Sequence, residues 1–111
     1  MCDVLIVGGG PAGLMAADYL SKLNYSITLV DQMPTMGRKF LMAGKSGLNL
    51  TKNEPFEKFL KNFSESTPQL LSALKNFTPD DVQTWATSLG ISLFTGSTGR
   101  VFPTHMKASP L

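Results

Sequence analysis

The sequence contains a single cysteine, Cys2, among its 111 residues. An internal disulfide and a C-x-x-C redox pair are therefore both excluded. A chain with so little cysteine is typical of the reducing cytosol. The N-terminus agrees, because Met1-Cys2-Asp3 carries an acid where a secretory signal peptide would be basic. We therefore expect a cytoplasmic protein.

Long apolar runs and a strong charge of either sign are also lacking. No apolar stretch is long enough to span a bilayer, so we expect no membrane partner. Ten basic residues against eight acidic ones give a net charge of +2, which makes no electrostatic case for nucleic acid, and we expect none. Arg38, Lys39, Lys45 and Lys52 form a local basic stretch. This stretch is either a solvated loop or, through Arg38 or Lys39, a contact to phosphate.

Histidine is as scarce as cysteine. His105 is the only one, and no acid or cysteine stands near it in the sequence. A lone histidine in such a setting supports neither general-base catalysis nor metal binding. No cluster has metal-ligand spacing either, so we assign no metal site, and we assign no catalytic acid or base.

The most informative stretch is an apolar segment that runs into a glycine turn. Val4–Val7 predicts a buried strand, and Gly8-Gly9-Gly10-Pro11-Ala12-Gly13 follows it in the G-x-G-x-x-G pattern of a dinucleotide-binding βαβ unit. Gly8 allows a sharp turn, Gly10 leaves no side chain between backbone and pyrophosphate, and Gly13 lets the helix approach the strand. The phosphates would sit at the helix N-terminus, where Pro11 gives up an N–H that has no intrahelical partner.

The second half of this unit follows in order. Apolar spacing predicts a helix over residues 11–23, with Asp18 and Lys22 as an exposed pair four residues apart. Ile27–Val30 reads as the second strand, and Asp31 ends it. A carboxylate at this position accepts hydrogen bonds from the adenosine ribose of a bound dinucleotide. The other interpretation is an acid at a strand end in solvent.

Residues 32–52 show no sustained periodicity and predict a long binding loop. Three glycines there are free to adopt positive φ, namely Gly37, Gly44 and Gly47. Ser46 and Asn49 can donate hydrogen bonds to phosphate or to ring edges, or they cap turns.

The remaining sequence predicts three helices and a hairpin. The helices lie within residues 53–90, and each has a proline near its start: Pro55, Pro68 and Pro79. Their phenylalanines and Trp85 fall at helical spacing and are core residues by default. After Gly90, residues 91–103 alternate and turn as a β-hairpin does. The prediction is an α/β fold, in which a partial Rossmann-like βαβ unit is followed by a helical segment and a short β-hairpin.

Together with the glycine turn and Asp31, two further motifs carry a family resemblance. With Gly37–Thr51 and Gly99–Pro103, the sequence resembles a bacterial family of FAD-dependent flavoproteins over nearly its whole length. These are the aminoacetone-oxidase-type and bile-acid-dehydro-reductase-type NAD(P)/FAD-dependent oxidoreductases, with a glutathione-reductase-like FAD domain. The resemblance implies that residues 1–111 are the N-terminal portion of an FAD-binding domain that is incomplete at its C-terminus. Its parts would be the βαβ unit (1–31), the binding loop (32–52), the helices (53–90) and the hairpin (91–103).

The resemblance also implies which residues bind FAD. By position, Pro11 and Ala12 would lie against the pyrophosphate and Asp31 would hold the adenosine ribose, with Gln32 beside it. Other residues would border the adenosine and phosphates (Arg38 and Lys39) or line the approach to the flavin (Ser46, Gly47 and Asn49). NAD(P)H would be an electron donor in the longer protein.

The residues leave alternatives open. The chain would be the FAD-binding region of a flavin-dependent oxidoreductase that holds the ADP part of FAD. It would otherwise be a truncated, non-catalytic fragment that binds a nucleotide or oligomerises. A third reading is an NAD-binding dehydrogenase domain. A two-stranded parallel sheet with one crossover helix leaves sheet edges uncovered, so we expect self-association through them.

Overall fold

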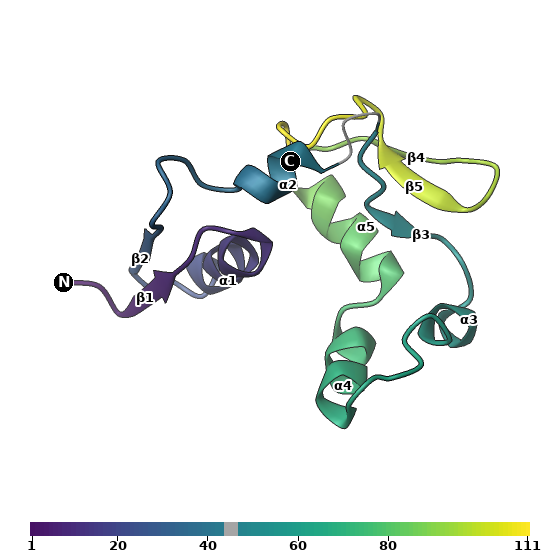
Figure 1. Ribbon diagram of the computed structural model, residues 1–111, viewed down its shortest axis with the longest axis horizontal. Helices are drawn as coiled ribbons and strands as arrows, with labels where there is room; N and C mark the ends of the chain where they lie inside the picture. Colours follow the sequence, from purple (N-terminus) through teal and green to yellow (C-terminus); the bar gives the residue numbers. More distant parts are fainter. Residues whose placement is uncertain (44–46) are drawn as a thin grey trace. The chain divides into compact units, whose positions relative to one another are not determined.

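A computed structural model describes residues 1–43 and 47–111 of the chain. The chain divides into two compact units, Met1–Ala43 and Gly44–Leu111, and each is described by itself. The division falls inside the predicted loop 32–52. Figure 1 labels the elements and colours them along the chain. In chain order they are β1 (Val4–Val7), α1 (Pro11–Ser21), β2 (Ile27–Val30), α2 (Arg38–Met42), β3 (Thr51–Lys52), α3 (Phe56–Leu60), α4 (Pro68–Asn76), α5 (Pro79–Ser88), β4 (Leu93–Thr95) and β5 (Arg100–Pro103).

The first unit is built on the predicted βαβ arrangement. β1 and β2 pair in parallel, with Val4 opposite Ile27 and Val7 opposite Val30. The helix α1 that joins them contacts both strands. Side chains alternate in exposure along each strand, as expected for a sheet covered on one face only. The α/β fold with a Rossmann-type βαβ unit is confirmed.

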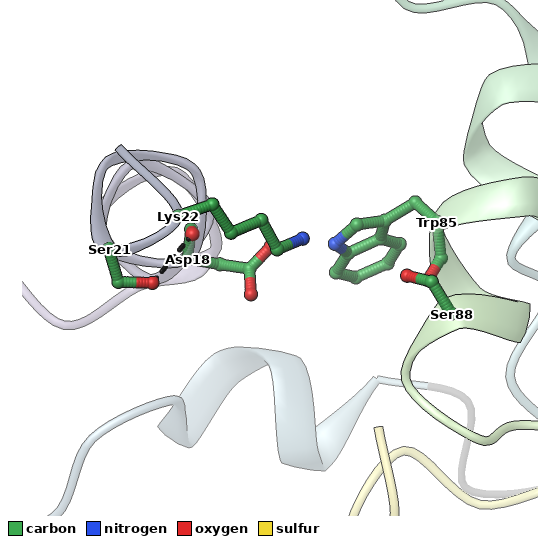
Figure 2. A network of polar contacts seen from close by, with 5 residues as sticks. All are labelled: Asp18, Ser21, Lys22, Trp85 and Ser88. Carbon is green, nitrogen blue, oxygen red and sulfur yellow. Dashed lines mark hydrogen bonds and ion pairs between the residues drawn. The ribbon is translucent and has the colours of Figure 1, made fainter. Parts of the chain in front are cut away.

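The end of α1 shows how this crossover is closed. The helix ends at Ser21 rather than at residue 23, and Asn24 takes a left-handed φ of 63° that turns the chain toward β2. The predicted ion pair is present, with 2.9 Å between Lys22 Nζ and Asp18 Oδ2 (Figure 2). Both side chains lie on the last turns of α1, where an acid that precedes a lysine by four residues is stabilising.

The second unit contains a three-stranded antiparallel sheet with the order β3-β5-β4. β4 and β5 form the predicted hairpin, in which Phe94 lies opposite Phe102 and their rings stack with centroids 5.5 Å apart. β3 was not predicted. It has two residues and pairs with the start of β5, so its existence depends on a partner about fifty residues away in sequence.

The apolar core of the second unit gathers where α5 packs on β3 and β4. Its buried apolar members are Leu48, Ala86, Ile91, Val101 and Ala108. Pro103 on β5 is fully buried beside them. The helix that brings Ala86 into this core begins with a capping box, because Thr78 Oγ1 accepts from the Asp81 N–H while the Asp81 carboxylate accepts from the Thr78 N–H.

All three predicted helices of this unit are present, but the expectation of buried phenylalanines is only partly correct. Phe59, Phe63 and Trp85 are half-buried, whereas Phe77 remains 40% exposed. No residue of α4 is buried, so the apolar stripe that ends at Phe77 has little to pack against. At the end of α5, Ser88 Oγ donates to the carbonyl of Trp85 (Figure 2), and Gly90 stops the helix with a φ of 83°.

Within the described residues, no helix combines the length and the apolar character needed to cross a membrane.

Candidate functional site

The glycine turn between β1 and α1 has three glycines with distinct structural roles. Gly8 adopts a φ of 111°, which an L side chain rarely tolerates, and its N–H donates to the Val30 carbonyl at 2.7 Å. A Cβ on Gly13 would stand 1.9 Å from the Gly8 carbonyl oxygen, so α1 approaches the turn only because Gly13 has no side chain. A Cβ on Gly10 would meet nothing within 4 Å, which leaves this part of the backbone open.

The N-terminus of α1 is uncapped. Gly10 is the N-cap residue and has no side chain to accept from the first turn, Pro11 follows at the first helical position, and the first turn holds no acidic residue. The leading N–H groups of a helix have no intrahelical acceptor and carry the positive end of the helix dipole. The start of α1 therefore offers hydrogen-bond donors and a favourable field to an anion.

Asp31 follows β2 directly, and each of its two carboxylate oxygens accepts a hydrogen bond from a backbone N–H. Oδ2 accepts from the Gly9 N–H at 2.6 Å, and Oδ1 accepts from the Met33 N–H at 2.7 Å. The Met33 N–H, followed by that of Gly9, lowers the pKa of Asp31 below its ordinary value of 3.8. A carboxylate has about four acceptor positions, so further ones remain for a ligand.

The segment after Asp31 returns to the glycine turn. Gly37 has a left-handed φ of 67°, and its N–H donates to the Gly9 carbonyl at 2.7 Å. The short helix α2 begins at this point with Arg38 and Lys39. This helix and its anchoring bond lie within the stretch predicted to be a loop.

These parts enclose a pocket of about 370 Å³ in the first unit. That volume lies at the lower end of the range usual for ligand sites, about 300–1,000 Å³. Seven of the predicted binding residues line it: Gly8, Gly10, Pro11, Asp31, Gln32, Arg38 and Lys39. Its chemistry fits a ligand that combines anionic groups with hydroxyls, since backbone N–H groups and two cations suit phosphates and a carboxylate suits a sugar.

Ala12 and Gly13 do not line this pocket; they form the first turn of α1 behind it. Five lining residues were not singled out as binding residues: Val7, Gly9, Met33, Thr35 and Gly37. The sequence signal for Gly37 is the freedom of a glycine in this loop to adopt positive φ. Gly9 occupies a variable position of the glycine pattern, and the pattern alone gives it no role.

The other predicted residues fall elsewhere. Ser46 lies outside the described residues. Gly47 and Asn49 belong to the second unit, where Asn49 is exposed and Gly47 faces Met106. A Cβ on Gly47 would stand 2.3 Å from Met106 Cε, which gives this glycine a packing role of its own. The predicted place of Ser46, Gly47 and Asn49 beside a flavin stays a prediction.

The strand–glycine turn–helix–strand arrangement, with an acid at the end of the second strand, defines a Rossmann-type unit. Residues 2–111 match the family model described as the HI0933-like protein Rossmann domain, and the chain belongs to this family. This match confirms the family resemblance drawn from the sequence motifs.

Two relatives with curated names give the family a context. The chain is 32% identical over 99 residues to a ribosomal RNA dihydrouridine synthase of Haemophilus influenzae, an alignment that covers 88% of this chain and 24% of the relative. It is 40% identical over 57 residues to the FAD-dependent monooxygenase ankC of Aspergillus thermomutatus, covering 51% of this chain and 9% of that protein. The chain thus spans a quarter or less of the length of these relatives.

Proposed function

We propose that this chain is the FAD-binding N-terminal region of a flavin-dependent oxidoreductase and that its pocket holds the ADP part of FAD. The observation that carries this proposal is the pocket itself. It combines the uncapped start of α1, the cations Arg38 and Lys39, and the Asp31 carboxylate. The name of the FAD-dependent relative supports FAD over other dinucleotides.

Each of the binding residues has a definite role in this proposal. Within the pocket the pyrophosphate lies against the backbone at Gly10 and Pro11, where the absent Cβ of Gly10 leaves room for it, and it extends toward Ala12 in the first turn of α1, outside the pocket lining. Arg38 and Lys39 balance the phosphate charge, and Asp31 with Gln32 faces the adenosine ribose. When bound, FAD supplies the electron-transfer chemistry, and this region binds and orients it.

The proposal extends to the rest of the chain. Residues 1–111 form the N-terminal portion of an FAD-binding domain, with the βαβ unit in residues 1–31, the binding loop in 32–52, the helices in 53–90 and the hairpin in 91–103. Ser46, Gly47 and Asn49 line the approach to the flavin, and NAD(P)H serves as electron donor in a longer protein. The scarcity of cysteine supports a cytoplasmic location.

A second candidate function concerns the reaction rather than the cofactor. The identity of 32% to a ribosomal RNA dihydrouridine synthase over 88% of this chain favours the same activity for a longer protein that contains it. Mass spectrometry of ribosomal RNA from host cells with and without the gene tests this: loss of one dihydrouridine on deletion supports it, and an unchanged content contradicts it. The expectation that no nucleic acid is bound stays a prediction until then.

Titration of the purified chain with FAD, followed by flavin fluorescence, tests the proposed function. We expect Arg38→Gln and Lys39→Gln each to weaken FAD binding about 1.4- to fivefold, because exposed charge contacts contribute about 0.2–1 kcal/mol. Lys22→Gln is the matched control, since it removes the same charge from the far end of α1 and leaves FAD affinity unchanged.

The outcomes separate the alternatives. A yellow preparation that loses its flavin on Asp31→Ala supports FAD binding. A colourless protein that binds ADP weakly supports the non-catalytic fragment, and tighter binding of NADH than of FAD supports the dehydrogenase domain.

A further inference from the structure

The Gly9 peptide lies at a junction of three segments. Its N–H donates to Asp31 Oδ2 at 2.6 Å, and its carbonyl accepts from the Gly37 N–H at 2.7 Å. Both backbone groups of this buried residue are therefore in use. Through them the glycine turn is tied to the end of β2 on one side and to the start of α2 on the other.

Packing around Gly9 confirms how closely these segments approach. A Cβ on Gly9 would stand 3.0 Å from Met36 Cγ and 3.1 Å from Asp31 Oδ2. The side chain of Met36 thus occupies the space beside the glycine turn that any larger residue at position 9 would need. A Cβ at this variable position of the glycine pattern would therefore need the side chains of Met36 and Asp31 to shift by a few tenths of an ångström.

The carboxylate of Asp31 is central to this junction. Its second oxygen accepts from the Met33 N–H at 2.7 Å, so that one side chain holds both the glycine turn and the first residues of the returning segment. Hydrogen bonds from N–H groups to a carboxylate are stronger than those to a neutral acceptor. Removing the carboxylate would leave the bond from the Gly37 N–H to the Gly9 carbonyl, with the packing of Met36, to hold residues 33–37 against the turn.

We propose that Asp31 is a positioning residue that, through the Gly9 peptide, holds residues 33–37 and hence Arg38 and Lys39 at the pocket before the dinucleotide binds. The inference rests on the proposed function, because Arg38 and Lys39 need to be held in place only if the pocket binds an anionic dinucleotide. It assigns Asp31 a task besides any contact to ribose. The loop that carries the cations is preorganised by an acid at the opposite end of its own segment.

Amide hydrogen exchange of the ligand-free chain, measured by NMR, tests this inference. In Asp31→Ala we expect the amides of Gly9, Met33 and Gly37 to exchange at least tenfold faster than in the unaltered chain. The Gly8 amide, which donates to the Val30 carbonyl, is the internal control and keeps its rate. Asp31→Asn retains one acceptor oxygen, so we expect intermediate rates and a partial recovery of FAD affinity relative to Asp31→Ala.

The decisive measurement is the exchange rate of Gly37, whose N–H donates to the Gly9 carbonyl and not to Asp31. An unchanged Gly37 rate in Asp31→Ala overturns the inference, even where Gly9 exchanges faster. So does an equal acceleration of Gly8 and Gly37 in Asp31→Asn, since that pattern reports loss of the fold. If the unaltered chain binds no FAD, the proposed function fails, and the exchange pattern still decides whether Asp31 positions the segment.

Discussion

The glycines of the turn after β1 differ in what their missing side chains allow. At Gly13 the limit is internal, because the Gly8 carbonyl oxygen lies where a Cβ would be. At Gly10 the space is empty and opens on the pocket, so no contact among the described residues demands a glycine there. Gly13 therefore serves the fold, and we propose that Gly10 serves the ligand, although both belong to the same motif.

This difference predicts that a substitution at Gly13 mainly lowers the stability of the first unit, whereas a substitution at Gly10 mainly weakens FAD binding. Gly13→Ala forces backbone to move and should destabilise the first unit by about 1–3 kcal/mol. Gly10→Ala should cost about 1 kcal/mol or less in stability while it weakens FAD binding about tenfold, because its methyl group enters the phosphate site. Exchange of the Ile6 amide, which lies on the paired side of β1 between those of Val4 and Gly8, measures the stability, and flavin fluorescence measures the binding. Equal effects of both substitutions on both quantities would contradict the assignment.

For single residues, the sequence predicted the place of a residue along the helices and strands better than it predicted which groups that residue contacts. Asp31 could be placed at the end of β2 because the spacing of strand, turn and helix is regular. Its bonds to Gly9 and Met33 could not be predicted, since they depend on the path of residues 33–37, which has no periodic pattern. Gly47 was predicted to line the approach to the flavin. Its packing on Met106 could not be predicted, because the two residues are almost sixty positions apart in sequence.

At the scale of elements, the predicted helices and strands are those with strong local signals. β1, α1 and β2 follow from apolar spacing, and α4 and α5 follow from a proline near the start of an apolar helical pattern. The short helix α2 follows Gly37 and lacks the directly preceding proline that marks the equally short α3, and β3 exists only through pairing with β5. Both unpredicted elements thus depend on tertiary contacts.

The capping box of α5 makes stability depend on pH. The Thr78 N–H, followed by the Thr78 hydroxyl, lowers the pKa of Asp81 below 3.8. A lowered pKa in the folded state means that the stabilisation is complete above the ordinary value and is lost as pH falls through the folded one. Asp81→Asn should therefore destabilise the second unit at neutral pH, and the difference from the unaltered chain should vanish in strong acid.

Urea unfolding monitored by the fluorescence of Trp85, the only tryptophan, measures this effect. Thr78→Ala removes the same cap and should cost about 1 kcal/mol. Asp80→Asn is the control, because it removes a charge from the same turn without breaking the capping box. A difference between Asp81→Asn and the unaltered chain that stays constant from neutral pH to strong acid would count against the cap.

At the scale of the whole molecule, the two units differ in how much apolar surface they bury. The buried apolar residues among those described all lie in the second unit. In the first unit, the sheet face opposite α1 presents Leu5, Val7 and Val30, which are 59%, 79% and 41% exposed. A parallel sheet is normally covered on both faces, so this face and the unpaired strand edges beside it favour association.

The exposed sheet leads to a prediction about self-association. Sedimentation velocity over a concentration series should show the average mass of the chain rising with concentration. Leu5→Lys places a charge on the exposed strand, a device that blocks edge pairing, and should keep the protein monomeric. Tyr19→Lys is the matched control, because Tyr19 is 64% exposed on α1, on the covered side of the sheet. A monomer at every concentration, or equal behaviour of the two variants, would show that the sheet does not drive association.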